Sequence, residues 1–141
     1  MTNKSYDIIT VGGGLGGAAL AKVMTEHGAR VLVVEREKRF KDRIRGEFFA
    51  PWGVAETQAL GLYDLLRTTC TLEAPRFGLY TDAEFGESRD LMATAARRLP
   101  FLTFHHPEMQ EVVLQATAAA GAEVRRGASV REVKLGGVPT V

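Results

Sequence analysis

The sequence predicts an α/β fold built around a parallel β-sheet, with short antiparallel strands later in the chain. An apolar, β-branched run ends in the glycine cluster VGGGLGG, small and apolar residues at helical spacing follow it, and a second apolar run comes next. Together they occupy the first 35 residues, close to the ~30 residues of one βαβ unit. Because such crossovers are right-handed, we expect the two strands to lie side by side and parallel.

The elements of this unit follow from local patterns. The first strand is predicted over residues 6–11 (YDIITV), which are apolar and β-branched, as in a buried parallel strand. The helix is predicted over residues 15–27 and ends before Gly28, which stands where a C-terminal helix glycine belongs. The second strand is predicted over residues 30–35 (RVLVVE).

The middle of the chain changes pattern. Residues 36–47 are polar, carry charges of both signs and predict a loop, after which Pro51 opens a helix expected to run to about residue 66. Between residues 71 and 104, short stretches such as FGLYT and FLTF are separated by Gly, Asp and Pro, which is typical of antiparallel strands. We therefore expect a second layer or domain to start here.

The end of the chain returns to the first pattern. Pro107 opens a helix expected to stop at Gly121, and residues 122–126 (AEVRR) predict a strand. Residues 129–135 (SVREVKL) alternate apolar and polar, and the Gly-Gly pair after them predicts a hairpin turn into another strand. Since the sequence stops as that strand begins, we expect the chain to be the N-terminal part of a longer protein, truncated at residue 141.

Composition and charge narrow the range of partners. The 141 residues are 45% hydrophobic and 25% charged, with a formal charge of +1, so no strong field draws nucleic acid or a membrane surface. A small-molecule partner is expected instead. Cys70 is the single cysteine and has no zinc-type spacing around it. Since no signal-peptide pattern and no apolar run of ~20 residues occurs, we expect a cytoplasmic location.

The glycine cluster matches a dinucleotide-binding motif. Gly12, Gly14 and Gly17 fit GxGxxG between a predicted strand and a predicted helix. The first glycine allows a tight turn, the second lets the backbone approach a pyrophosphate, and the third lets helix and strand pack closely. The amides of Leu15, Gly16 and their neighbours, together with the helix dipole, are expected to hold the anion.

Glu35 is the expected ribose ligand. It ends the second strand, eighteen residues after Gly17, where the motif places a carboxylate about 20 residues on. An acid there disfavours a ribose 2′-phosphate. A glycine turn with an unrelated glutamate is the alternative, which the agreement of strand, glycines, helix and acid disfavours.

Two charged clusters have weaker signals. Arg43 and Arg45 alternate, so both guanidiniums point the same way in extended backbone and are candidates for a phosphate, although a solvated loop is the plainer interpretation. His105 and His106 are neighbours, which would point to opposite faces of a strand, and no third ligand stands at a suitable spacing, so a strand-to-helix junction is the better interpretation. We therefore expect no metal site.

Three segments carry a family resemblance. DIITVGGGLGGAALAKVMTEHGARVLVVER, RIRGEFFAPWGVAETQALGLYDLL and HPEMQEVVLQATAAAGAEV resemble the N-terminal part of FAD-dependent monooxygenases of the p-hydroxybenzoate hydroxylase type. The resemblance implies a Rossmann-like FAD-binding domain with a parallel sheet, plus the first antiparallel strands of a substrate domain. It implies a FAD-binding βαβ unit and helix over 1–70, substrate-domain strands over 71–104, and a return to the FAD-binding domain with the start of a hairpin over 105–141.

The same resemblance implies roles for individual residues. The acid after the second strand binds the adenosine ribose in this family, which falls on Glu35, and an arginine contact to the dinucleotide falls on Arg45. Arg36 and Arg43 are secondary candidates. A glutamine early in the later helix matches Gln110, whereas many relatives carry arginine where this sequence has His106.

The implied activity is insertion of one oxygen atom from O2 into an aromatic or polyketide-like substrate, with NAD(P)H reducing the FAD. No catalytic side chain is assigned, and the 141-residue piece alone is expected to be inactive. Since GEFFAP at 46–51 also resembles flavin-dependent halogenases and geranylgeranyl reductases, these remain alternatives. A non-catalytic NAD-binding Rossmann module is a third. Substrate and oligomeric state are not determined by these residues.

Overall fold

A computed structural model describes residues 4–43, 46–81 and 84–137. The chain divides into two compact units, one formed by Met1–Lys41 with Gln110–Val141 and the other by Asp42–Met109. Each unit is described by itself. No helix in the described ranges combines the length and apolar character needed to cross a membrane.

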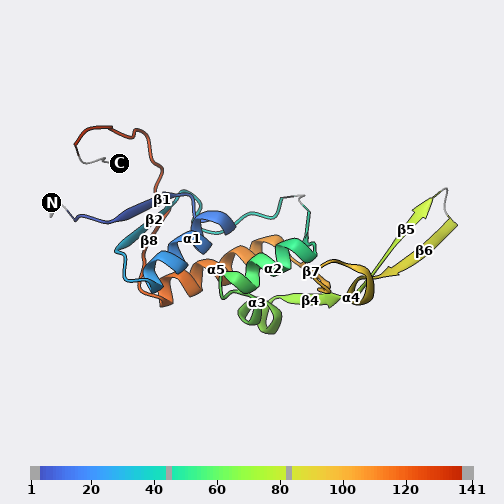
Figure 1. Ribbon diagram of the computed structural model, residues 1–141. Helices are drawn as coiled ribbons and strands as arrows, with labels where there is room; N and C mark the ends of the chain where they lie inside the picture. Colours follow the sequence, from blue (N-terminus) through green and yellow to red (C-terminus); the bar gives the residue numbers. More distant parts are fainter. Residues whose placement is uncertain (1–3, 44–45, 82–83, 138–141) are drawn as a thin grey trace. The chain divides into compact units, whose positions relative to one another are not determined.

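The first unit is built on a parallel sheet. Its strands are β1 (Ile8–Val11), β2 (Val31–Glu35) and β8 (Glu123–Arg126), in the order β1-β2-β8 and all parallel. Helix α1 (Leu15–Glu26) connects β1 to β2, which confirms the predicted βαβ unit (Figure 1). Because the strands are parallel, their carboxyl ends meet at one edge of the sheet, where ligands of such folds bind.

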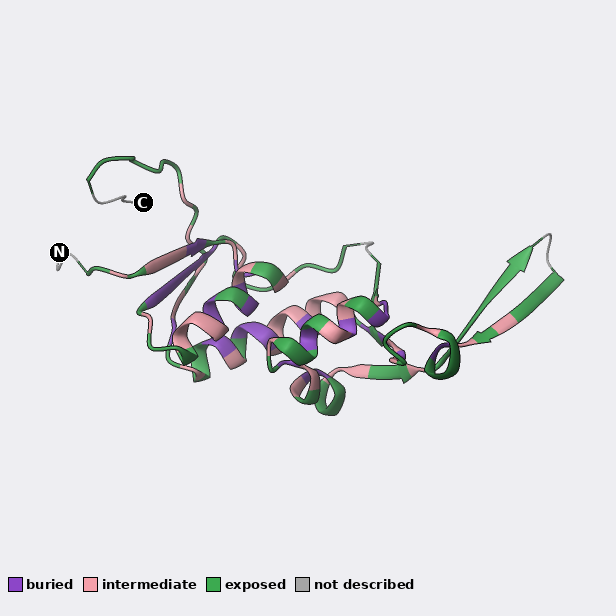
Figure 2. Ribbon diagram, viewed as in Figure 1, coloured by how far each residue is buried: buried purple, intermediate pink, exposed green. Residues whose placement is uncertain are grey.

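The core of this unit lies around β2. All five residues of β2 are buried, as are Ala18, Ala19 and Ala21 of α1 (Figure 2). Thr117 of α5 (His106–Ala119) is fully buried, and its hydroxyl lies 2.9 Å from the Ala18 carbonyl oxygen. The small side chains of α1 let the two helices approach closely enough for this contact.

The second unit contains antiparallel strands and short helices. Its elements are β3 (Phe48–Phe49), α2 (Pro51–Ala59), α3 (Tyr63–Thr69), β4 (Thr71–Ala74), β5 (Arg76–Thr81), β6 (Glu84–Asp90), α4 (Leu91–Thr94) and β7 (Phe101–Phe104). Strands β3, β7 and β4 form one antiparallel sheet, and β5 pairs with β6 in a hairpin. The core includes Val54, Leu62, Leu66 and Leu102. The predicted fold class, a parallel sheet followed by antiparallel strands, is confirmed.

The single helix expected from Pro51 to residue 66 is wrong. The chain forms α2 and α3 instead, and Gly61 between them has φ +64°. The amide of Leu62 donates to the Thr57 carbonyl at 2.8 Å, which closes the end of α2. This is the glycine-terminated helix end in which the left-handed residue reverses the chain direction.

The strand expected over residues 129–135 is also wrong. In the described part of this segment only Lys134 has an isolated bridge, and residues 131–137 are all exposed. An alternating pattern gives a stable strand only where a partner strand takes up its backbone groups and its apolar face is buried. Residues 138–141, where the second strand of the hairpin was expected, lie outside the described residues.

Candidate functional site

The glycine loop links the end of β1 to the start of α1. Gly12 has φ +107°, and its amide donates to the Val34 carbonyl at 2.8 Å. A Cβ atom on Gly17 would lie 2.1 Å from the Gly12 carbonyl oxygen, so no other residue fits without moving the backbone. The structure therefore supports the roles expected for the first and third glycines: a tight turn and close packing of helix on strand.

The first turn of α1 presents backbone amides without a capping side chain. Gly14 is the N-cap, no side chain caps the helix, and the first turn contains no acidic residue. The amides of Leu15, Gly16 and Gly17 have no acceptor within the helix, as in the first turn of any α-helix. These amides and the helix dipole form a site suited to a phosphate or pyrophosphate group.

Glu35 is held between two backbone amides. The residue is 6% exposed, and its Oε2 accepts a hydrogen bond from the Gly13 amide at 2.7 Å. Its Oε1 accepts from the Glu37 amide, also at 2.7 Å. Each carboxylate oxygen can accept more than one hydrogen bond, so the carboxylate is able to bind ribose hydroxyls while it holds the loop.

Gly13 was not singled out by the sequence motif. A Cβ on Gly13 would lie 3.2 Å from the Glu35 Cβ and 3.3 Å from Leu114 Cδ1. A side chain there would press on the carboxylate and on α5. The sequence signal is only an extra glycine inside the motif, and its meaning depends on the residues that fold around it.

Gln110 lies next to the glycine loop. A Cβ on Gly14 would be 3.4 Å from the Gln110 Nε2 atom, so the side-chain amide of this half-buried residue lies against the loop. Gly14, Glu35 and Gln110 come from three separate stretches of sequence. The fold brings them to the carboxyl edge of the sheet.

The arginines of the 36–47 loop are less well placed by the structure. The Arg36 side chain is 67% exposed, with its Nε 3.8 Å from a Glu37 carboxylate oxygen. Arg43 is exposed, and Arg45 lies outside the described residues. Cofactor contacts by Arg36 and Arg45 stay predictions.

In the second unit, two carboxylates lie near His105. One ligand-type atom each from Asp42, Glu47 and His105 lies within 4.8 Å of the others, with the His105 Nε2 atom 3.8 Å from Asp42 Oδ2. All three residues are exposed, so their hydration competes with any ion. The sequence pattern did not predict this grouping, because Asp42 and His105 are far apart in the chain.

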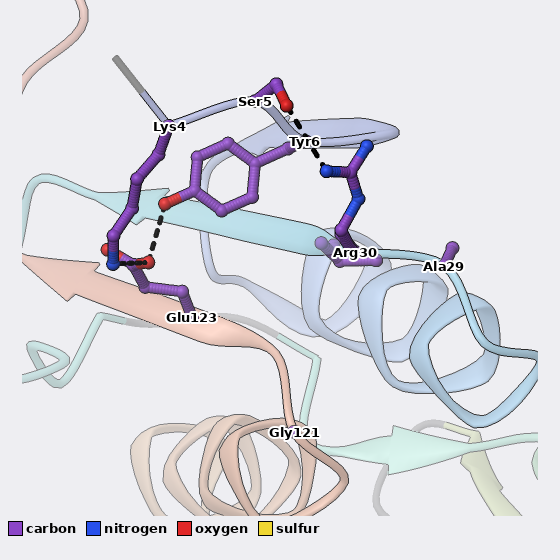
Figure 3. A pocket seen from close by; sticks show the side chains of 8 residues that line it. Lys4, Ser5, Tyr6, Ala29, Arg30, Gly121 and Glu123 are labelled. Carbon is purple, nitrogen blue, oxygen red and sulfur yellow. Dashed lines mark hydrogen bonds and ion pairs between the residues drawn. The ribbon is translucent and has the colours of Figure 1, made fainter. Parts of the chain in front are cut away.

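A polar groove lies at the opposite, amino edge of the parallel sheet (Figure 3). Glu123 accepts hydrogen bonds there from Tyr6 at 2.5 Å, from Lys4 at 3.0 Å and from Arg125 at 2.9 Å. These bonds, that from Tyr6 foremost, lower the pKa of the Glu123 carboxyl from 4.5 to about 2. Glu123 thus already binds three side chains, and the groove is distinct from the glycine-loop site.

Comparison with known proteins identifies the family of this chain. A family model described as FAD binding domain matches residues 5–138. Squalene epoxidase 6 of Arabidopsis thaliana is 40% identical over 78 residues, which are 55% of this chain and 15% of that protein. The chain therefore spans only a small part of the curated relatives that it matches.

Solved structures share the fold. PqsL of P. aeruginosa, in complex with 2-aminobenzoylacetate, has a TM-score of 0.78 at 22% identity, covering 94% of this chain and 36% of PqsL. The p-nitrophenol 4-monooxygenase PnpA of Pseudomonas putida has a TM-score of 0.79 at 22% identity, covering 92% and 33%. The myxobacterial halogenase CndH has a TM-score of 0.76 at 25% identity, covering 94% and 31%.

Proposed function

Because this chain belongs to the FAD binding domain family, we propose that it is the FAD-binding N-terminal part of a flavin-dependent monooxygenase. The observation that carries the proposal is the glycine loop at the end of β1, fixed by the buried carboxylate of Glu35 through the Gly13 amide. When bound, FAD supplies the redox chemistry, while the protein supplies binding, orientation and exclusion of water.

The residues at the carboxyl edge of the sheet fit this cofactor. Gly12 makes the turn with φ +107°, and Gly17 lets α1 pack against the Gly12 carbonyl. Gly14 lets the backbone approach a pyrophosphate, and the amides of Leu15 and Gly16 are suited to bind it. Glu35 is the expected partner of the adenosine ribose hydroxyls. The side-chain amide of Gln110, beside Gly14, is a further candidate contact.

For the whole protein, we propose insertion of one oxygen atom from O2 into an aromatic or polyketide-like small molecule, with NAD(P)H as the reductant. Oxygen insertion is supported by the squalene epoxidases and monooxygenases among the relatives. An aromatic substrate is supported by PnpA, which is named for p-nitrophenol, and by PqsL, whose structure contains 2-aminobenzoylacetate. The inactivity of the isolated piece and the cytoplasmic location stay predictions.

Halogenation is the second candidate for the whole protein. It is supported by the likeness to CndH, which has the highest identity among the structures described above. A reductase is a further alternative. It is supported by the likeness to a geranylgeranyl bacteriochlorophyll reductase-like protein from Thermoplasma acidophilum, with a TM-score of 0.72 at 21% identity. The NAD-binding module is disfavoured by the family match.

The first experiment is a cofactor titration of the purified protein. We expect FAD to bind with a change in its absorption and fluorescence, and NAD to compete weakly or not at all. Tight NAD binding without FAD binding would contradict the proposal. For the reaction, the full-length protein is supplied with NAD(P)H and 18O2, with and without chloride or bromide. Incorporation of 18O supports the monooxygenase, and halide-dependent product supports the halogenase.

A further inference from the structure

Arg126 is anchored at the same edge of the sheet as Glu35. It is the last residue of β8 and stands opposite Glu35 in the parallel register. Its guanidinium donates through Nε to the Glu37 carbonyl at 3.3 Å and through Nη1 to the Glu111 carboxylate. The same group lies 4.8 Å from the centre of the Phe40 ring, within range of a cation–π contact.

The segment 36–41 packs against the end of β8 through further contacts. A Cβ on Gly127 would lie 3.1 Å from Lys38 Cγ, so the Lys38 side chain covers this glycine. The Ala128 amide donates to the Glu35 carbonyl at 3.1 Å. Segment 36–41 is therefore held along residues 126–128, although its charges alone predict a solvated loop.

The burial of Arg126 is unusual for a surface cation. Its side chain is only 23% exposed, and its Nη2 atom is buried with no acceptor among the described residues. A guanidinium seldom leaves a donor unsatisfied inside a protein, because the lost hydration is not replaced. Its remaining contacts, to Glu37, Glu111 and Phe40, thus fix its position without satisfying every donor.

These contacts connect Arg126 to the carboxylate of Glu35 through a single residue, Glu37. The carbonyl of Glu37 accepts from Arg126, while the amide of the same residue donates to Glu35 Oε1. We propose that Arg126 is a positioning residue for the adenosine half of FAD, which holds the segment after β2 so that Glu35 presents its carboxylate to the ribose. This inference rests on the proposed function, and Arg126 itself is not placed in contact with the cofactor.

The first test needs no cofactor. Segment 36–41 contains trypsin sites at Arg36, Lys38, Arg39 and Lys41, so we expect Arg126→Met to speed cleavage there several-fold. The control is Arg125→Met, since Arg125 is the neighbouring residue on β8 and binds Glu123 at the amino edge. Equal cleavage rates in the two variants would overturn the proposal.

The second test is a double-mutant cycle on FAD affinity. We expect Arg126→Met to raise the Kd for FAD about tenfold, whereas Arg125→Met changes it less than about twofold. Because Arg126 acts through Glu35, the effect of Arg126→Met should largely disappear in a Glu35→Ala background. A full tenfold effect in that background would show a merely structural role and overturn the inference.

Two further outcomes separate the proposals. If Arg126→Met does not fold, Arg126→Lys replaces it, because a single ammonium cannot bind Glu111 and the Glu37 carbonyl in the same fork geometry; we expect an intermediate Kd. A failure of the unsubstituted protein to bind FAD would overturn the proposed function. Normal FAD binding by both Arg126 variants would overturn this inference alone.

Discussion

At the scale of single residues, Gly17 gives the sharpest steric test. A Cβ there would lie 2.1 Å from a backbone oxygen, whereas a Cβ on Gly16 would meet nothing within 4 Å. We expect Gly17→Ala to lower the free energy of unfolding by about 1–3 kcal/mol. Gly16→Ala should change it by less than about 1 kcal/mol. Urea unfolding of both variants measures this, and equal losses would contradict the packing argument.

Glu35 gives a test of charge and hydrogen bonding. Its two oxygens each accept from a backbone amide, but glutamine offers only one acceptor and directs its NH2 group at the other amide. Glu35→Gln is therefore expected to retain little more FAD affinity than Glu35→Ala. Both Glu35→Gln and Glu35→Ala should weaken FAD binding by about 1–3 kcal/mol. Flavin titration measures the loss, and unchanged retention in either variant would exclude the ribose role.

The prediction for Arg45 rests on the sequence alone, because this residue lies outside the described residues. If the alternation of Arg43 and Arg45 serves the dinucleotide, Arg45→Ala should lower flavin occupancy more than Arg39→Ala. Arg39 is an exposed arginine of the same loop and makes a matched control. The ratio of flavin to protein absorbance is the measurement, and equal occupancies would assign the arginines to solvated surface.

At the scale of elements, the contact between α1 and α5 depends on Thr117. Its hydroxyl lies 2.9 Å from the Ala18 carbonyl and 2.8 Å from the Val113 carbonyl. Thr117→Val removes this donor at nearly constant volume and should lower the free energy of unfolding by about 1–2 kcal/mol. Thr25→Val is the control, because the Thr25 hydroxyl donates to the Ala21 carbonyl within α1. If Thr25→Val lowered the free energy of unfolding as much as Thr117→Val, the contact between α1 and α5 would not account for the loss.

Element prediction succeeded where the pattern is local and failed where it is not. The elements β1, α1 and β2 follow from an apolar run, a helical period and a closing glycine within short windows. By contrast, the periodicity of 51–66 continues through Gly61, and only the backbone at that residue shows that the helix ends. The strand predicted over 129–135 fails because a strand depends on a partner that its own sequence cannot specify.

At the scale of the whole molecule, the Glu123 network links stability to pH. The folded pKa of about 2 lies below the ordinary 4.5, so the stabilisation is present above pH 4.5 and is lost as the pH falls toward 2. The stability difference between the unsubstituted protein and Glu123→Gln should be constant near neutral pH and vanish near pH 2. Urea unfolding across this range checks it, and a difference that persists at pH 2 would contradict the assignment.

By itself, the sequence determined the α/β class and the dinucleotide-type glycine loop, and it put Glu35 at the end of the second strand, because each depends on neighbouring residues or on a fixed spacing along one βαβ unit. Only the tertiary structure decided which residues from separate segments of the chain lie in contact. It placed Gln110 beside Gly14, set the Gly13 amide on Glu35, and fastened segment 36–41 to β8 through Arg126. The Gly13–Glu35 bond depends on the pairing of β1 with β2. The other two contacts depend on the packing of α5 and β8 beside the first strands, which joins residues far apart in the chain.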